Sequence, residues 1–152
     1  MASVFVEETL IKSKPSDEET FIDIFSGDNK PFRTMAHFFS FCAALGYSQN
    51  RSYETKKRVN EVRDRTFQSQ DLEGSIFTIA LSKKRDPLVL DNVDDCYKIY
   101  EDFINGGLSI IKEEAKDLDN DELVQRLLTL VHEKALENMD LEDEVEVSID
   151  EI

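Results

Sequence analysis

The segment from Thr34 to Gly46, TMAHFFSFCAALG, constrains the fold of this chain more than any other stretch. Its large apolar residues recur at spacings of three and four, at Met35, Phe38, Phe39, Cys42 and Leu45. This period predicts an α-helix, and further apolar residues widen the stripe until most sides of the helix are apolar. Thr34 suits the N-cap, and Gly46 suits a left-handed residue beyond the last turn. We therefore predict that a buried helix forms the centre of the core.

Shorter patterns predict the other elements. Apolar residues at helical spacing indicate helices near 21–25, over 71–83, from 93 to 111 and over 119–135. A buried strand over 75–81 is the alternative within the second of these, because short apolar runs suit both structures. Asn105-Gly106-Gly107 is expected to interrupt the third helix, since glycine weakens helices. Residues 3–11 alternate weakly, as a short strand does, and the polar segment 47–65 is expected to form a loop followed by an exposed turn or helix.

Together these patterns predict a mainly α protein. At 152 residues, a single domain can bury about 70% of its unfolded surface in one core. Five glycines and three prolines leave little material for the turns of an all-β fold. We expect one compact helical domain of about five helices over residues 1–136, with a minor short β element, followed by an acidic and flexible tail over residues 137–152.

The composition also bears on location. No apolar run approaches the roughly 18 residues that a membrane span needs. The opening MASVFVEETLIK has neither the basic start nor the apolar stretch of a secretory signal. Cys42 and Cys96 form no CxxC pair and are expected to be buried, reduced thiols. These observations predict a cytoplasmic protein that does not enter a membrane.

The net charge of −15 is distributed unevenly along the chain. Residues 30–85 contain eleven Lys or Arg and five Asp or Glu. Residues 1–29 contain two basic and seven acidic side chains, and residues 86–152 contain five and twenty-one. Charge that is sorted by segment bears on binding partners rather than on fold.

The basic middle supplies one candidate contact surface for nucleic acid or a protein partner. Its residues are Arg51, Lys56, Lys57, Arg58, Arg63 and Arg65. Tyr47, Tyr53 and Phe67 lie near them in sequence, as stacking side chains would. Such a patch could bind a phosphate backbone. The alternative is a solvated face that the acidic flanks of the same chain neutralise.

The C-terminal tail is a second candidate. Residues 137–152 contain eight acidic side chains and no basic one. Val145, Val147 and Ile149 alternate with polar residues, a period that suits a strand. We expect the tail to be mobile in the free protein and to bind a partner by adding a strand to an exposed sheet edge.

Catalytic and metal-binding patterns are missing from the sequence. The two histidines form neither HxxxH nor HExxH, and GxSxG, GxGxxG and the phosphate-binding GxxxxGK[ST] do not occur. Two E-x-K triplets, at 54–56 and 114–116, match part of a nuclease site, but a chain with 34% charged residues contains them by chance. We therefore expect no catalytic residue, no metal site and no cofactor.

Three ordered blocks resemble a known family. They are Pro31–Met35 with Ala43–Tyr47, then Ile76–Leu81, then Phe103–Lys112 with its Asn-Gly-Gly-Leu run. The set is similar to the DNA phosphorothioation system-associated protein 4 family and spans about residues 31–135. The resemblance implies a bacterial cytoplasmic protein encoded among genes that add sulfur to DNA or restrict DNA lacking that mark. It implies no catalytic residues.

Three hypotheses follow for function. The first is a non-enzymatic accessory protein of a restriction or anti-phage defence system, which binds protein subunits of the DNA-modification machinery through its acidic flanks. The second is a DNA-binding module that uses residues 51–65. The third is an acidic mimic of DNA, in which carboxylates of residues 86–152 occupy the DNA site of another protein.

Overall fold

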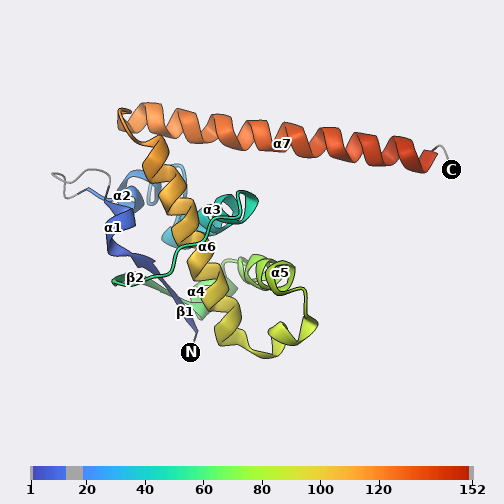
Figure 1. Ribbon diagram of the computed structural model, residues 1–152. Helices are drawn as coiled ribbons and strands as arrows, with labels where there is room; N and C mark the ends of the chain where they lie inside the picture. The colour runs from blue at the N-terminus through green and yellow to red at the C-terminus, as the bar shows by residue number, and fades with distance from the viewer. Residues whose placement is uncertain (1, 13–18, 151–152) are drawn as a thin grey trace. The chain divides into compact units, whose positions relative to one another are not determined.

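In a computed structural model, the chain is described over residues 2–12 and 19–150, and within the last helix the side chains of residues 134–135 and 138–150 lie outside the description (Figure 1). The elements in chain order are β1 (Ser3–Glu7), α1 (Glu8–Ile11), α2 (Phe21–Phe25), α3 (Met35–Ser48), β2 (Arg58–Arg63), α4 (Asp64–Ser69), α5 (Glu73–Lys84), the 3-10 helix η1 (Pro87–Asp91), α6 (Val93–Glu114) and α7 (Asn120–Asp150). The prediction of a mainly α protein with a minor β element is confirmed.

The chain divides into two compact units, Met1–Lys116 and Asp117–Ile152. This division differs from the expected boundary between residues 136 and 137. The first unit contains every element except α7, which makes up most of the second. Within the described ranges, none of the helices combines the length and the apolar character that crossing a bilayer requires.

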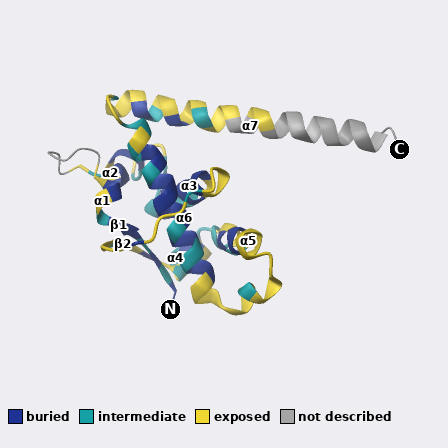
Figure 2. Ribbon diagram, in the orientation of Figure 1, coloured by how far each residue is buried: buried dark blue, intermediate teal, exposed yellow. Residues whose placement is uncertain are grey.

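The helix α3 lies at the centre of the core, as the sequence predicted. Thr34 caps it by accepting a hydrogen bond from the backbone N–H of His37 at 3.2 Å. Phe38, Phe39 and Cys42 are fully buried, and dark blue follows α3 and its neighbour α6 in Figure 2. The expected left-handed end at Gly46 is wrong, because α3 continues through Gly46 to Ser48.

The helix α6 is unbroken from Val93 to Glu114, so the expected interruption at residues 105–107 is wrong. The two glycines do not interrupt α6. They allow other backbone segments to approach it closely. A Cβ at Gly107 would lie 1.9 Å from the backbone oxygen of Cys42 on α3. A Cβ at Gly106 would lie 1.9 Å from the backbone oxygen of Arg51 in the loop after α3. Helical glycines therefore allow the backbones of α3, this loop and α6 to meet.

The sheet has two antiparallel strands, β1 and β2, with Val4 opposite Val62 and Val6 opposite Val59. The strand expected over residues 3–11 is confirmed for Ser3–Glu7, whereas residues 8–11 form the short helix α1. The expectation of a loop and a turn or helix over residues 47–65 is wrong for β2. Asn60 has a φ of 53°, and β2 contains one more residue than β1 between the paired positions. This bulge places the two valines of β2 three positions apart, which hides the period of two that marks a strand.

Two further predictions concern helices. The helical interpretation of residues 71–83 is confirmed by α5, in which Ile76, Ile79 and Ala80 are buried. The helix expected over 119–135 is confirmed by α7, which continues to Asp150. Residues 145–149 therefore have a helical backbone where the alternating pattern suggested an extended one.

Candidate functional site

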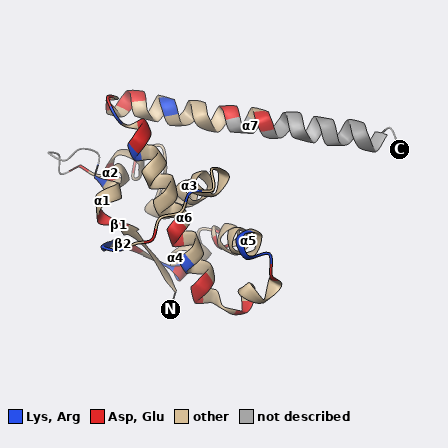
Figure 3. Cartoon of the chain, in the orientation of Figure 1, with Lys and Arg blue, Asp and Glu red and all other residues tan. Residues whose placement is uncertain are grey.

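Carboxylates of the same chain lie close to most of the six predicted basic contact residues, and Figure 3 shows Lys and Arg in blue and Asp and Glu in red along the chain. Four of them face a carboxylate: Arg51 Nη1 lies 2.8 Å from Glu113, Lys57 Nζ 3.8 Å from Glu8, Arg58 Nη2 3.7 Å from Glu101 and Arg63 Nε 3.8 Å from Glu61. The charges of this basic segment are thus partly balanced by the chain's own acidic residues. Except at Glu101, these pairs are solvent-exposed and contribute little to stability.

Arg63 and Arg65 are the two predicted residues that line a common hollow. This groove of about 290 Å³, the β2 groove, lies between β2, the start of α3 and α4. Its lining residues are Thr34, Met35, Ala36, Glu61, Val62, Arg63, Arg65 and Thr66. Both arginine side chains are exposed, as are Lys56, Lys57 and Arg58, so the β2 groove is one part of the basic segment that is open to an anionic partner.

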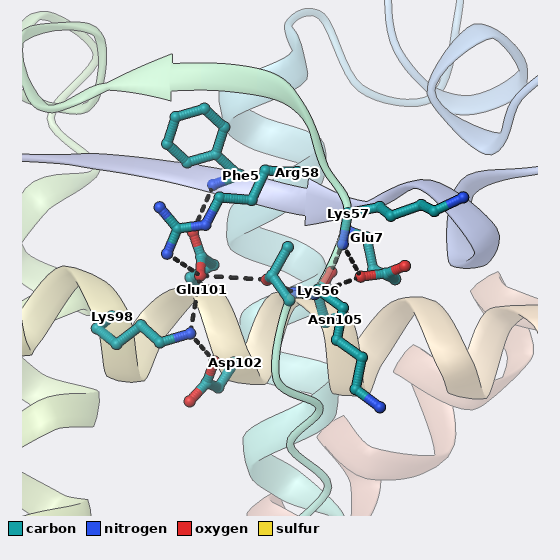
Figure 4. Close-up of polar contacts among 10 residues, drawn as sticks. Phe5, Glu7, Lys56, Lys57, Arg58, Lys98, Glu101, Asp102 and Asn105 are labelled. Atoms are coloured by element: carbon teal, nitrogen blue, oxygen red, sulfur yellow. Dashed lines mark hydrogen bonds and ion pairs between the residues drawn. The ribbon is translucent and has the colours of Figure 1, made fainter.

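A buried polar cluster joins β1, the loop before β2 and α6 (Figure 4). Its members are Glu7, Thr55, Glu101 and Asn105, which are between 0% and 9% exposed. Buried polar groups destabilise a fold unless hydrogen bonds satisfy them. The hydrogen-bond partners of each side chain therefore indicate whether the cluster has a structural or a catalytic role.

Asn105 and Thr55 connect the three segments. Asn105 Oδ1 accepts a hydrogen bond from the backbone N–H of Glu7 at 2.9 Å, and its Nδ2 donates to Thr55 Oγ1 at 2.6 Å. Thr55 Oγ1 in turn donates to Glu101 Oε2 at 3.1 Å. One side chain of α6 thus holds both β1 and the loop.

Glu7 accepts from two consecutive backbone amides. Its Oε2 lies 2.6 Å from the N–H nitrogen of Lys56 and 2.9 Å from that of Lys57. Burial acts to raise the pKa of this carboxyl, but the backbone N–H donors outweigh it, so the pKa of Glu7 lies below its ordinary value. The ionised carboxylate is therefore the form that fits this site.

Glu101 is held from several directions. Its Oε1 accepts from the backbone N–H of Phe5 at 2.8 Å, and its Oε2 accepts from Lys98 Nζ at 3.1 Å. The guanidinium of Arg58 covers the Phe5 ring at 5.1 Å and faces the same carboxylate. Lys98 also donates to Asp102 at 2.9 Å. Burial opposes the charge of Lys98, yet these two acidic partners raise the pKa of Lys98 above its ordinary value.

The polar cluster borders a groove of about 370 Å³, the α6 groove, whose lining includes Arg58, Tyr97, Lys98 and Glu101. Burial raises the pKa of Tyr97 to about 12, so its phenol stays protonated at neutral pH. A general base needs an oxygen that is free to take a proton from substrate. Both oxygens of Glu101 already accept hydrogen bonds, so this geometry fits a structural tie better than a catalytic site.

One comparison with known proteins identifies the family. The family model described as DNA sulphur modification system-associated protein 4 matches residues 13–150. The chain belongs to this family. Searches of curated proteins and of solved structures find no match.

The blocks that resemble this family now have structural roles. The Asn-Gly-Gly run supplies Asn105 to the polar cluster and two glycines to the contact between α6 and the segments it crosses. The block around Thr34 supplies the cap of α3. In this member of the family, the quoted blocks therefore maintain the packing of the first unit.

The cysteines and histidines of the chain have the following surroundings. Burial raises the pKa of both Cys42 and Cys96, which disfavours the reactive thiolate. His37 Nδ1 lies 2.7 Å from the hydroxyl of Thr34 at the start of α3, and His132 is exposed on α7. Within the described parts of the chain, His, Cys, Asp and Glu side chains nowhere gather in threes that could hold a metal ion.

The structure also reveals apolar surface that the sequence analysis did not assign. One set lies at the turn from α5 to α6: Leu81, Leu88, Leu90 and Val93. A second set lies on α7: Leu128, Val131 and Leu136. Leu88 is 70% exposed and Leu128 is 55% exposed. Clusters of exposed apolar side chains mark surfaces that bind other proteins.

The polar cluster was missed in the sequence, although one signal for it was present. Tyr97, Glu101 and Ile104 recur at helical spacing and are all buried. An acidic residue within an apolar stripe indicates a buried and hydrogen-bonded carboxylate. The partners of that carboxylate come from β1 and the loop, and no local pattern identifies them.

Proposed function

We propose that this chain is a non-enzymatic accessory protein of a bacterial DNA sulphur-modification system, acting in the cytoplasm in restriction or anti-phage defence. In this proposal it binds a basic, DNA-handling protein component of that system. The observation that carries the proposal is that the second unit has a strongly acidic sequence and that α7 exposes apolar side chains.

The charge of the second unit supports a basic partner. Residues 117–152 contain thirteen acidic and two basic side chains. Proteins that handle DNA present basic surfaces, which an acidic helix complements. Complementary charge steers association and gives it a strong dependence on salt.

The apolar side chains of α7 support a helix-in-groove contact. Leu128, Val131 and Leu136 are 55%, 46% and 48% exposed. Positions 128 and 131 lie three apart and share a face of the helix. An amphipathic helix of this kind binds by placing apolar side chains in a partner's groove. The involvement of Val145, Val147 and Ile149 stays a prediction, and the helical backbone at these positions favours this binding mode over strand addition.

The binding test uses purified protein components of the host's DNA sulphur-modification system, each titrated with the full chain. We expect one component to bind, and we expect Leu128→Asp with Val131→Asp to weaken its binding at least about tenfold. Gln49→Asp with Gln68→Asp is the matched control, because it adds the same two charges at exposed positions of the first unit. Unchanged affinity in the α7 double variant would contradict the proposal.

The non-enzymatic part has its own test. Purified protein should contain no stoichiometric metal and should not cleave DNA in the presence of Mg²⁺. Stoichiometric zinc in metal analysis would contradict this expectation. So would DNA cleavage that is abolished by Glu114→Gln, which removes the carboxylate of the second E-x-K triplet.

Direct DNA binding is a second candidate, favoured by the exposed Arg63 and Arg65 of the β2 groove. If this candidate holds, Arg63→Ala with Arg65→Ala should weaken DNA binding and reduce its salt slope by about two. Arg51→Ala is the control, because Arg51 pairs with Glu113 away from that groove. The absence of DNA binding at low salt would exclude this candidate.

The acidic charge of α7 also favours DNA mimicry as the mode of partner binding. In that case the chain and DNA compete for one site on the partner. A titration of the partner–DNA complex with this protein should then release the DNA. Formation of a ternary complex would show that α7 binds elsewhere on the partner.

A further inference from the structure

The turn from α5 through η1 to α6 exposes an apolar surface that we call the η1 corner, made of Leu81, Leu88, Leu90 and Val93. Their side chains are 37%, 70%, 40% and 44% exposed. η1 itself contains no buried residue, and Figure 2 shows this turn mostly in yellow, with one teal segment, between α5 and α6.

Hydrogen bonds hold the η1 corner in a defined conformation. Asp86 accepts from the backbone N–H of Leu88 through Oδ1 at 3.0 Å and from that of Val89 through its carbonyl at 3.1 Å. The N–H of Asn92 then donates to the carbonyl of Val89 at 3.1 Å, and Asn92 caps α6. Two leucines are therefore held in solvent by an ordered turn, which favours a preorganised contact surface.

Opposite charges flank the η1 corner along the chain. Lys84 and Arg85 lie at the end of α5, whereas Asp91 ends η1 and Asp94 lies in the first turn of α6, and all four are exposed. Figure 3 shows blue at the end of α5 and red at the start of α6, with further red directly after the blue, where Asp86 follows Arg85 in the sequence. Within the described residues, no salt bridge joins any of these four charges to an oppositely charged side chain.

We propose that the η1 corner binds the η1 corner of a second copy of this chain. A two-fold axis through the apolar centre brings each basic end against the acidic end of the other copy. Lys84 and Arg85 of one protomer then face Asp91 and Asp94 of its partner, twice in each dimer. Leu88 and Leu90 of both copies become buried between these pairs.

The order of charges favours a second copy over another protein. The basic end carries Lys83, Lys84 and Arg85 against one acidic residue, Asp86, and the other end carries Asp91, Asp94 and Asp95. A surface with opposite net charges at its two ends and an apolar centre complements a second copy of itself under two-fold rotation. The apolar centre comprises four side chains, which is less than a standard protein interface provides. The dimer is therefore weak, with a dissociation constant in the range of about 1–100 μM. This inference is independent of the partner proposed for α7.

The first experiment is sedimentation velocity of the full chain from about 1 μM to about 500 μM, a range that brackets such affinities. The weight-average mass should rise toward that of a dimer as the concentration increases. Leu88→Asp should leave the protein monomeric at every concentration, with its thermal midpoint unchanged. Leu136→Asp on α7 is the matched control and should dimerise like the unmodified chain.

A charge exchange tests the symmetry of the contact. One variant carries Lys84→Asp with Arg85→Asp, and the other carries Asp91→Lys with Asp94→Lys. Each variant alone should be monomeric, because like charges then meet at both ends of the contact. An equimolar mixture should restore dimers, since each exchanged end then meets its opposite in the other variant. Thermal unfolding of each variant controls for misfolding.

Three outcomes would overturn the proposal. The first is a monomer across the whole concentration range. The second is a dimer that survives Leu88→Asp or that Leu136→Asp abolishes, because either places the contact elsewhere. The third is failure of the two folded charge variants to associate when mixed.

Discussion

The backbone oxygen of Cys42 on α3 occupies the space that a side chain at position 107 on α6 would need. A Cβ at Gly107 would lie 1.9 Å from that oxygen, well inside van der Waals contact. The close contact between α3 and α6 therefore requires glycine, the residue without a side chain, at position 107. This relationship leads to the first prediction.

Replacing Gly107 by alanine should destabilise the protein. The added methyl group meets backbone, which cannot turn away as a flexible side chain can, so α3 and α6 must separate. We expect a loss of about 3 kcal/mol in the free energy of unfolding, measured by denaturant titration. A loss under about 0.5 kcal/mol would show that the two helices are farther apart than this structure has them.

Gly74 provides the matched control for that substitution. It lies in α5, and a Cβ there would have no neighbour within 4 Å. Alanine at this position should increase stability by about 0.5–1 kcal/mol, because glycine costs helices that much in conformational entropy. The same chemical change is thus expected to have opposite signs at two helical positions.

Phe38→Ala tests whether α3 is the centre of the core. Phe38 is fully buried and stacks on Phe25 with ring centroids 5.3 Å apart. We expect a loss of about 3–5 kcal/mol through cavity formation. Phe41→Ala, at a half-buried position of the same helix, should cost less. A loss below about 1 kcal/mol for Phe38→Ala in denaturant melts would place this face on the surface.

The buried carboxylate of Glu7 should make stability depend on pH. Its folded-state pKa lies below the ordinary value, so folding favours its ionised form. That stabilisation is complete above the pKa of the unfolded chain and is lost as the pH falls through the folded-state pKa. Glu7→Gln should lower the free energy of unfolding by about 1.5–3 kcal/mol at pH 7. The difference from the unmodified chain should shrink below about pH 4 in urea titrations.

Asp102 should contribute to the pH dependence with the opposite sign. Burial raises its pKa, although Lys98 acts against that rise, so folding disfavours the ionised form. Its destabilising contribution is present at neutral pH and disappears on acidification. Asp102→Asn should therefore make stability fall more steeply between pH 7 and pH 4. An identical slope in the two proteins would contradict this assignment.

Removal of residues 137–152 should separate folding from partner binding. The core around α3 and α6 lies in the unit Met1–Lys116, which this truncation leaves intact. We expect the thermal midpoint to change by less than about 2 °C. Affinity for the proposed basic partner and its salt dependence should both fall, because eight negative charges are removed. Unfolding of the truncated chain would show that the segment is integral to the fold.

Local patterns in the sequence determined the helices that hold the core. The three- and four-residue spacing of apolar side chains predicted α3 and α5, and the cap at Thr34 was readable because it needs one hydroxyl at one position. Such features depend on neighbours within a few residues, so the order of amino acids alone is enough to show them. The family resemblance had the same basis, since its blocks are short and contiguous.

Other parts of the fold were decided by contacts between distant residues. β2 escaped prediction because a bulge at Asn60 shifts its valines out of the strand period, and only pairing with β1 makes the bulge tolerable. Gly106 and Gly107 looked like a helix break because glycine weakens an isolated helix. In the folded chain, α3 and the loop after it require small residues there, and packing outweighs propensity.

The candidate binding surfaces also have some features that the sequence shows by itself and others that depend on the fold. Charge sorted by segment and the acidic C-terminal region were determined by the sequence itself, because net charge needs no fold. Tertiary structure alone decided which basic residues face carboxylates of the same chain, that Glu7 and Glu101 are buried, and that Leu88 stays in solvent. The physical reason is that burial and hydrogen bonding depend on which distant segments meet, and Asn105 reaches its partner Glu7 across 98 positions of the chain.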